Sequence, residues 1–424
     1  MNTQANIFNK KNRSFIFSII LSLLLIYTFL LISIVETQMI TMKNTVIRDA
    51  EIKIVIILAV LIYFISRRYI KLHKVDKISI LYLIMILYLV FDILCMSIYN
   101  STNFKVAINL IGRNYFAVLI GAFFYLVKEN VNIEKIFKIT ILFTIINLVI
   151  SYVQHYSNSI LFPYLYDSYG NNIFNSIEFG ENNFRSVGIT SSGYNLGIVL
   201  IFLLTIDLAV ILSHEKKFVG FSKKFFIILF PFILISILYT QTRNIYFFSA
   251  YIICFLFIYY KIRILRKILI KYSIIISPIL YYIILSKISE LQNFLYDKSI
   301  YSLNSFQVRV GIFKDNIDLI RNSSILNILF GNKEIAIDNI FLYCINTIGI
   351  VGMILMITLT LAIYVKLVNI KKIDLISLIL ASYYSATFLL GLLNMLTFEF
   401  YFLSMILSSI WIRKREKILI NQQV

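Results

Sequence analysis

Long apolar runs separated by short basic turns recur along the whole 424-residue chain. Hydrophobic residues make up 60% of the sequence and charged residues 14%, and the chain contains only three prolines to interrupt the runs. A helix needs about 20 apolar residues to cross about 30 Å of hydrocarbon, and most of these runs approach that length. The composition excludes a water-exposed globular protein, so the sequence predicts an integral membrane protein.

The apolar runs lack the strict polar and apolar alternation that a membrane β-barrel shows. Only closed backbone hydrogen bonding survives in lipid, so the runs are expected to be helices. The predicted fold class is all-α, a single polytopic domain over residues 1–424 with about 12 transmembrane helices. The predicted spans are residues 14–35, 50–66, 78–99, 106–127, 136–154, 194–212, 225–241, 245–260, 270–286, 339–365, 375–395 and 398–412.

Lysine and arginine side chains gather at alternate ends of these spans. Basic residues near span ends are retained on the cytoplasmic side of a membrane. With the amino terminus inside, 27 of the 40 basic residues fall in the inner turns, and both termini face the cytoplasm. The net charge of +19 is then mainly a topology signal with attraction to anionic lipids, and we expect no nucleic-acid binding.

Two outer loops, near residues 154–193 and 287–338, are far longer than the other turns and hold most of the outward arginines. The first loop ends in a glycine- and hydroxyl-rich run from Phe184 to Gly197, which includes Arg185-Ser186-Val187-Gly188 and leads directly into the next span. Such a run lets backbone amides and a helix start point at an anion, and the planar charge of Arg185 suits phosphate. The alternative is a flexible loop whose arginine rests in the headgroup zone.

A second cationic position is Arg243, in the tight outer turn Thr240-Gln241-Thr242-Arg243-Asn244. In the second long loop, apolar residues at helical spacing from Phe306 to Ile320 predict a surface helix that carries Arg309 and Arg321. Glu334 and Asp338 follow, close to the start of the next span. An acid in that position is commonly an ordinary interfacial residue, and an arginine in a short turn can simply extend toward the headgroups.

Asp92, Arg113 and Asp207 lie inside predicted spans. A charge at the bilayer centre costs about 2.5 to 3.5 kcal/mol on insertion scales, so each needs a partner, water or an interfacial depth. We expect Asp92 to pair with Arg113, and Asp207 to lie close to the cytoplasmic surface. The three cysteines also lie within spans, so neither a disulfide framework nor a metal site is expected.

Several short motifs follow one another in the second half of the chain. They are Arg185-x-x-Gly188, Tyr194-Asn195-Leu196-Gly197, Thr242-Arg243, Arg309, Leu329-Phe330-Gly331, Asp338-Asn339 and Gly349-Ile350-Val351-Gly352. In their order and placement the chain resembles the O-antigen ligase and polymerase superfamily of bacterial polysaccharide assembly. The first half of the chain matches only as spans.

The resemblance implies an enzyme of the bacterial cytoplasmic membrane that needs no metal or cofactor. Its substrate would be an undecaprenyl-diphosphate-linked oligosaccharide, transferred with inversion to an acceptor hydroxyl at the outer face. Carried over, Arg185 and Arg243 hold the diphosphate, and Arg309, Arg321 and Arg113 are further substrate-binding positions. The resemblance further implies membrane lipids and a chain-length regulator protein as partners.

The residue type at the position of the general base bears on whether the chain resembles a polymerase or a ligase of the superfamily. Asp338, with Glu334 nearby, stands where the ligases tend to carry a histidine. This departure favours a polymerase of oligosaccharide repeat units over a ligase. A lipid-linked oligosaccharide flippase is the competitor from another class, although it should have short outer loops and two similar halves. A scaffolding membrane protein would leave the outward arginines without a role.

Overall fold

The computed structural model describes residues 75–99, 115, 118–126, 132–157, 186–188, 193–262, 264–276, 315, 318–331, 339–369, 373–393 and 398–422. Helices account for 87% of the described residues, which confirms the predicted all-α class. Five described helices are long and apolar enough to cross a membrane. The chain is therefore a membrane-embedded helical protein.

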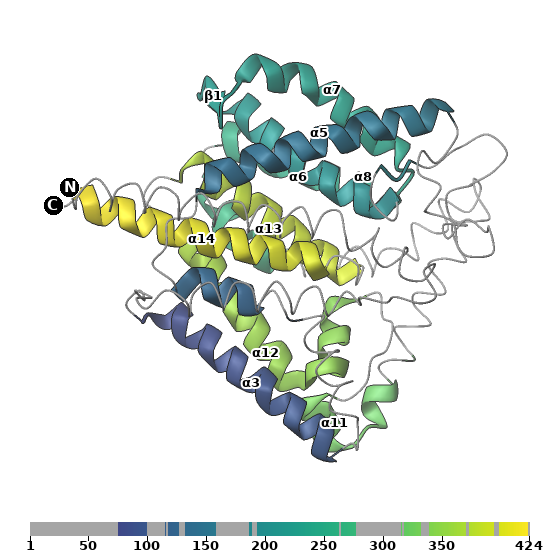
Figure 1. The fold of residues 1–424 in the computed structure, drawn as a ribbon, viewed down its shortest axis with the longest axis vertical. Helices are drawn as coiled ribbons and strands as arrows, with labels where there is room; N and C mark the ends of the chain where they lie inside the picture. The colour runs from purple at the N-terminus through teal and green to yellow at the C-terminus, as the bar shows by residue number, and fades with distance from the viewer. Residues whose placement is uncertain are drawn as a thin grey trace, which may run out of the picture.

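The helices are α3 (Lys77–Tyr99), α5 (Ile133–Ser157), α6 (Gly193–Leu212), α7 (Lys223–Tyr239), α8 (Arg243–Lys261), α11 (Ile325–Phe330), α12 (Ile340–Val368), α13 (Leu375–Leu393) and α14 (Phe398–Gln422), as Figure 1 shows. The long helices follow the predicted spans closely, except that α14 extends ten residues further, and the short α11 lies in the second predicted outer loop. A two-stranded hairpin, β1 (Lys217–Phe218) with β2 (Phe221–Ser222), connects α6 to α7. Residues 118–126, 264–276 and 318–321 are also helical. The predicted spans 14–35 and 50–66 lie outside the described residues.

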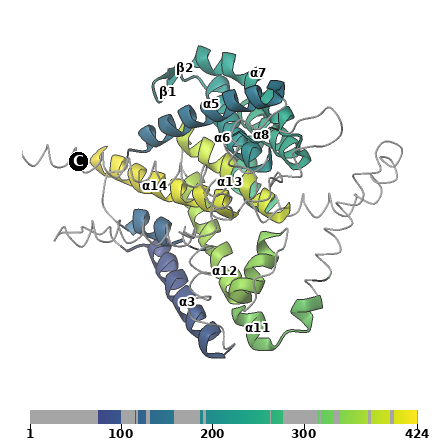
Figure 2. The ribbon, with the colours of Figure 1, turned by 45° about the vertical axis from the view of Figure 1, so that its right-hand side comes forward.

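Helix α6 is the most buried of the membrane-spanning candidates, with 89% of its apolar window inside the protein. It is apolar on every face, as expected of a helix that other helices surround. Its neighbours are α5, α7, α8 and α13. In Figures 1 and 2, α5 to α8 lie on one side of α13 and α14, and α3, α11 and α12 lie on the other. The pair α13 and α14 therefore separates two groups of helices.

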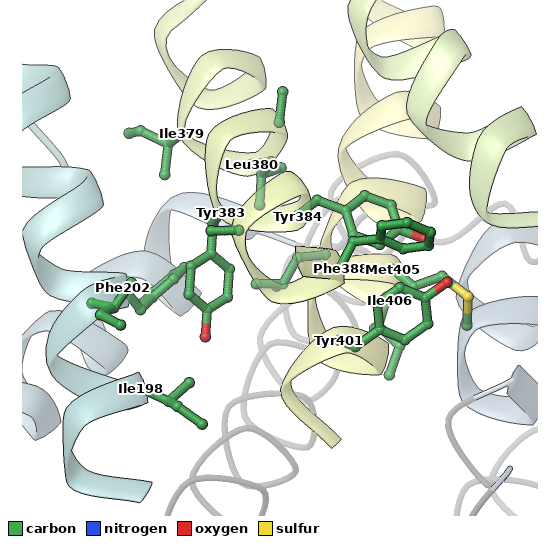
Figure 3. Close-up of a cluster of buried hydrophobic side chains, with 14 of the residues drawn as sticks. Ile198, Phe202, Ile379, Leu380, Tyr383, Tyr384, Phe388, Tyr401, Met405 and Ile406 are labelled. Carbon is green, nitrogen blue, oxygen red and sulfur yellow. The ribbon is translucent and has the colours of Figure 1, made fainter. Parts of the chain in front are cut away.

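Aromatic side chains with hydroxyl groups fill the space around α13 (Figure 3). Tyr383 meets Phe202 of α6 edge-on, with ring centroids 4.7 Å apart, and Tyr384 lies 5.6 Å from Tyr401 of α14. Among them, the Tyr401 hydroxyl bonds to the Thr360 hydroxyl of α12. In a membrane, such polar contacts and close packing hold helices together, because lipid tails are as apolar as leucine.

A network of charged side chains joins four segments at one end of the bundle. Lys366 Nζ of α12 lies 2.5 Å from an oxygen of Asp76, next to α3, and 2.6 Å from one of Glu416 in α14. Arg413 of α14 contacts the same two carboxylates at 3.4 Å and 2.8 Å. The Arg413 guanidinium also lies 3.8 Å from the ring centroid of Tyr125, in the helical segment 118–126. We call these five residues the ion network.

The predicted topology places the residues of the ion network, in all four segments, at the cytoplasmic side of the membrane. Arg415 donates to the last carbonyls of α12, at Lys366 and Leu367, and Trp411 donates to Ser377 at the start of α13. These contacts agree with helices that alternate in direction, whereas the side that faces the cytoplasm stays a prediction. We call the opposite end of the bundle the outer end.

The ion network predicts an acid-sensitive contribution to stability. Burial alone would raise the pKa of Asp76, but hydrogen bonds from Lys366, Ser79 and Tyr125 outweigh it and hold that pKa well below its usual range. A carboxylate with a depressed folded-state pKa stabilises the fold above its unfolded pKa of about 4 and loses that effect as the pH falls. We expect the unfolding temperature in detergent to drop between about pH 5 and pH 3.

The variant Asp76→Asn isolates this contribution. It should unfold at a lower temperature than the wild type near neutral pH, and the gap should narrow on acidification, because Asp76 takes up a proton in the unfolded wild type while the folded state still holds it ionised. Asp318→Asn is the matched control, since the Asp318 side chain is 63% exposed and contacts Arg321 at 3.7 Å. A gap that stays constant down to about pH 3 would contradict the prediction.

Candidate functional site at the outer end

Three residues of the first long loop, Ser186 to Gly188, are fixed to the outer end of α5. The Oε1 atom of Gln154 accepts hydrogen bonds from the amides of Val187 at 3.0 Å and Gly188 at 2.8 Å. Gln154 Nε2 donates to the Gly188 carbonyl at 2.8 Å, and the Ser186 hydroxyl donates to the Ser151 carbonyl at 2.9 Å. We call Gln154 with Ser186, Val187 and Gly188 the outer-end clamp.

The clamp also contacts the turn between α7 and α8. The Ser186 amide donates to the carbonyl of Tyr239, the last residue of α7, at 3.0 Å. The hydroxyls of Thr240 and Thr242 bond to main-chain carbonyls within this turn, and Arg243 is the first residue of α8. The residue after Arg185 is thus bonded to a residue four positions before Arg243. Two motifs far apart in the sequence meet at this point.

Gly188 adopts a left-handed backbone conformation that favours glycine. Its φ is +63°, and an added β-carbon would lie 2.8 Å from Asn147 Oδ1. The amides of Ser186, Val187 and Gly188 all donate to acceptors within the protein. The expectation that backbone amides of this run point at an anion is therefore wrong for these three residues, because their donors are already used. Side chains are left as the means of binding an anion there.

The structure describes two of the seven predicted site residues. Arg243 begins α8, although its side chain is not among the described ones. Arg321 is 76% exposed and pairs with Asp318 three residues earlier, at 3.7 Å. Such an exposed pair contributes little to stability. The predicted substrate-binding residues Arg185, Arg113 and Arg309 and the predicted catalytic residues Glu334 and Asp338 lie outside the described residues.

A second contact between motifs occurs where α12 breaks. Gly349 has φ +66° and ψ 178°, and α12 changes direction there (Figures 1 and 2). An added β-carbon would lie 2.1 Å from the Leu329 carbonyl oxygen, and one on Gly331 would lie 2.6 Å from the main-chain carbon of Thr347. Both glycines have positive φ, so a larger residue is excluded by strain and by collision. The end of α11 and the break in α12 therefore make a direct backbone contact.

Tyr88 of α3 bonds to both sides of this contact. Its hydroxyl lies 2.6 Å from the Ile348 carbonyl oxygen and 3.4 Å from that of Leu329. Phe91 packs edge-on against Phe330 at 5.5 Å. Tyr88 precedes the end of α3 by eleven residues, so this contact lies about 16 Å along the helix axis from that end. At such a depth in a membrane, carbonyls released by a broken helix need a donor from the protein.

Two acids are fully buried in the spans. Asp92 and Asp207 both have 0% exposure, and within the described part of the chain neither carboxylate has a hydrogen-bond partner. Asp207 lies five residues before the end of α6 and is covered by the neighbouring helices, whereas its closeness to the cytoplasmic surface stays a prediction. The predicted partner of Asp92, Arg113, is outside the described residues. An acid buried in a membrane requires a proton, a cation or a paired side chain.

Sequence reasoning did not identify Gln154 or Tyr88. Gln154 was visible only as a polar residue at the end of a predicted span, and Tyr88 is one of 29 tyrosines. Among the described residues, no group of three or more His, Cys, Asp or Glu side chains could hold a metal ion.

Replacing Gln154 by leucine tests the clamp. The change removes three hydrogen bonds and leaves two buried amides unpaired, which should cost about 2 to 4 kcal/mol of stability. In nanodiscs, hydrogen exchange at Val187 and Gly188 should accelerate by about 100-fold or more. Ser157→Ala is the control, since its hydroxyl donates to the Gln154 main-chain carbonyl at 3.4 Å and takes no part in the clamp. Unchanged exchange in Gln154→Leu would show that the clamp does not form.

Comparison with known proteins assigns no function to this site. No protein-family model matches the chain, and no curated protein matches it significantly.

Proposed function

We propose that this protein polymerises oligosaccharide repeat units carried on undecaprenyl diphosphate, at the outer face of the bacterial cytoplasmic membrane. The observation that supports this most is the hydrogen bond from Ser186 to Tyr239, because it brings the segment after Arg185 beside the turn that leads to Arg243. Two guanidinium groups held close together would suit a diphosphate, which accepts charge-assisted hydrogen bonds through several oxygens. The two motifs also belong to the set by which the chain resembles O-antigen polymerases and ligases.

In the proposed reaction, an acceptor hydroxyl oxygen attacks the anomeric carbon of the donor sugar. The bond from that carbon to the diphosphate breaks, and the electron pair leaves with the diphosphate, so the configuration inverts. Arg185 and Arg243 stabilise the charge that grows on the leaving group, and each such contact contributes about 1.5 to 3 kcal/mol. A carboxylate, Asp338 or Glu334, accepts the proton of the hydroxyl. Arg309, Arg321 and Arg113 hold the glycan or the leaving group.

Transfer to a different acceptor, as in a ligase, is the nearest variant of this chemistry. A flippase for the same lipid-linked substrate is the competing function from another class. The buried acids Asp92 and Asp207 favour it, since neither has a hydrogen-bond partner among the described residues, and acids within spans commonly mark proton or ion pathways. A scaffold without catalytic activity is the remaining alternative.

Replacing either arginine tests the proposed role of the diphosphate grip. Arg185→Ala and Arg243→Ala should each lower the polymerisation rate by about 100-fold or more, because a charge-assisted contact to the leaving group is lost. Lys267→Ala, a basic residue at the opposite end, is the control and should keep wild-type chain-length ladders. Normal ladders from both arginine variants, with normal membrane insertion, would refute these assignments.

Purified protein supplied with lipid-linked repeats distinguishes an enzyme from a transporter. Polymerisation needs no second compartment, so the proposed enzyme should lengthen glycans in detergent. A flippase should leave the repeats unchanged in detergent and move them across the bilayer of sealed vesicles. Flipping without elongation would exclude the proposed function.

A further inference from the structure

Four aromatic side chains form one group at the outer end, and the proposed chemistry does not use them. Tyr152, His155 and Tyr156 lie in the last turns of α5, and Tyr239 ends α7. The His155 ring stacks on the Tyr239 ring, with centroids 3.7 Å apart and an interplanar angle of 14°. Tyr152 and Tyr156 meet Tyr239 edge-on at 5.2 Å and 6.2 Å. We call these four residues the aromatic platform.

The platform offers ring surface and polar groups together. Tyr156 is 75% exposed, whereas the other three residues are half-buried. The Tyr239 hydroxyl donates to that of Tyr156 at 3.4 Å, and the Tyr152 hydroxyl donates to the Phe232 carbonyl at 3.0 Å. None of the four side chains carries a carboxylate, an ammonium or a guanidinium group. A neutral ligand with both apolar faces and hydroxyl groups matches this surface.

The platform is held in a fixed position relative to the clamp. Tyr239 contributes its ring to the platform and its carbonyl to the hydrogen bond from Ser186, the residue after Arg185. In a glycosyl diphosphate, the first sugar is bonded directly to the phosphate. A surface that binds this sugar must therefore adjoin the groups that bind the diphosphate. The position of Tyr239 meets this requirement.

We propose that the aromatic platform binds a pyranose ring of the lipid-linked glycan, which stacks its C–H face on the exposed rings. This inference rests on the proposed function. The other reading of tyrosines at a helix end is an interfacial belt in contact with lipid headgroups. Two features favour the sugar. The four rings pack on one another instead of spreading along the membrane surface, and one of them is histidine, whereas belts are enriched in Trp and Tyr.

The test measures elongation kinetics in proteoliposomes with a defined lipid-linked repeat. Tyr156→Ala should raise KM for the repeat by about fivefold to tenfold and change kcat by less than about twofold, since binding is lost without a change in chemistry. Tyr156→Trp should restore a KM near that of the wild type. Tyr272→Ala removes a tyrosine that is 42% exposed elsewhere in the protein, and it should behave as the wild type. Saturation-transfer NMR with the lipid-free repeat should show sugar contacts that Tyr156→Ala removes.

The possible outcomes separate failure of the platform from failure of the proposed function. Elongation by the wild type with unchanged KM in Tyr156→Ala overturns the platform and leaves the proposed function standing. A variant that alters insertion or thermal stability but not KM or the NMR contacts identifies a lipid belt and also overturns it. Failure of the wild type to elongate repeats in either detergent or proteoliposomes instead refutes the proposed function.

Discussion

A polar group inside a bilayer must find its partner within the protein, because the hydrocarbon offers none. This constraint accounts for the contacts that organise the described part of the chain. Tyr88 supplies a hydroxyl where α12 breaks, and Gln154 pairs the amides of Val187 and Gly188. At the other end, Lys366 and Arg413 each contact two carboxylates. The same requirement makes the buried acids Asp92 and Asp207 notable, because neither carboxylate has a hydrogen-bond partner among the described residues.

The two ends of the bundle are stabilised differently. The ion network joins charged side chains from four segments, and Arg413 within it is only 8% exposed. The outer end depends on neutral hydrogen bonds to loop backbone, whereas the close backbone contact of Gly331 and Gly349 lies deeper in the bundle. The charged side chains of the ion network pair with one another at their end of the bundle. In our proposal, Arg185 and Arg243 next to the clamp bind a ligand instead. A site that grips an anionic substrate would require this division.

Most helices were predictable because their determinants are local. Apolar runs of the right length, ended by lysine and arginine, placed α3, α5, α6, α7, α8, α12 and α13 within a few residues. The span predicted to end at residue 412 is part of a longer helix, since α14 continues to Gln422 through the residues of the ion network. The break at Gly349 was not predicted, because one glycine in an apolar run does not by itself show the backbone that approaches it.

The site was predictable as a set of motifs but not as a geometry. The clamp joins Gln154 to residues more than thirty positions later, and no local pattern specifies that pairing. The expectation for the backbone amides of Ser186 to Gly188 was wrong for the same reason, since their acceptors lie on α5 and α7. The burial of Asp207 also depends on neighbouring helices, which a position near a span end does not reveal.

The central claim is that the clamp holds position 185 beside position 243, and cross-linking tests it most directly. Cysteines replacing Arg185 and Arg243, in a cysteine-free protein in native membranes, should be joined efficiently by a bifunctional thiol reagent with a reach of about 8 Å, roughly the span of two to three extended residues. Adding Gln154→Leu should reduce this cross-linking. Failure to cross-link two cysteines that both react with a monofunctional reagent would contradict the account.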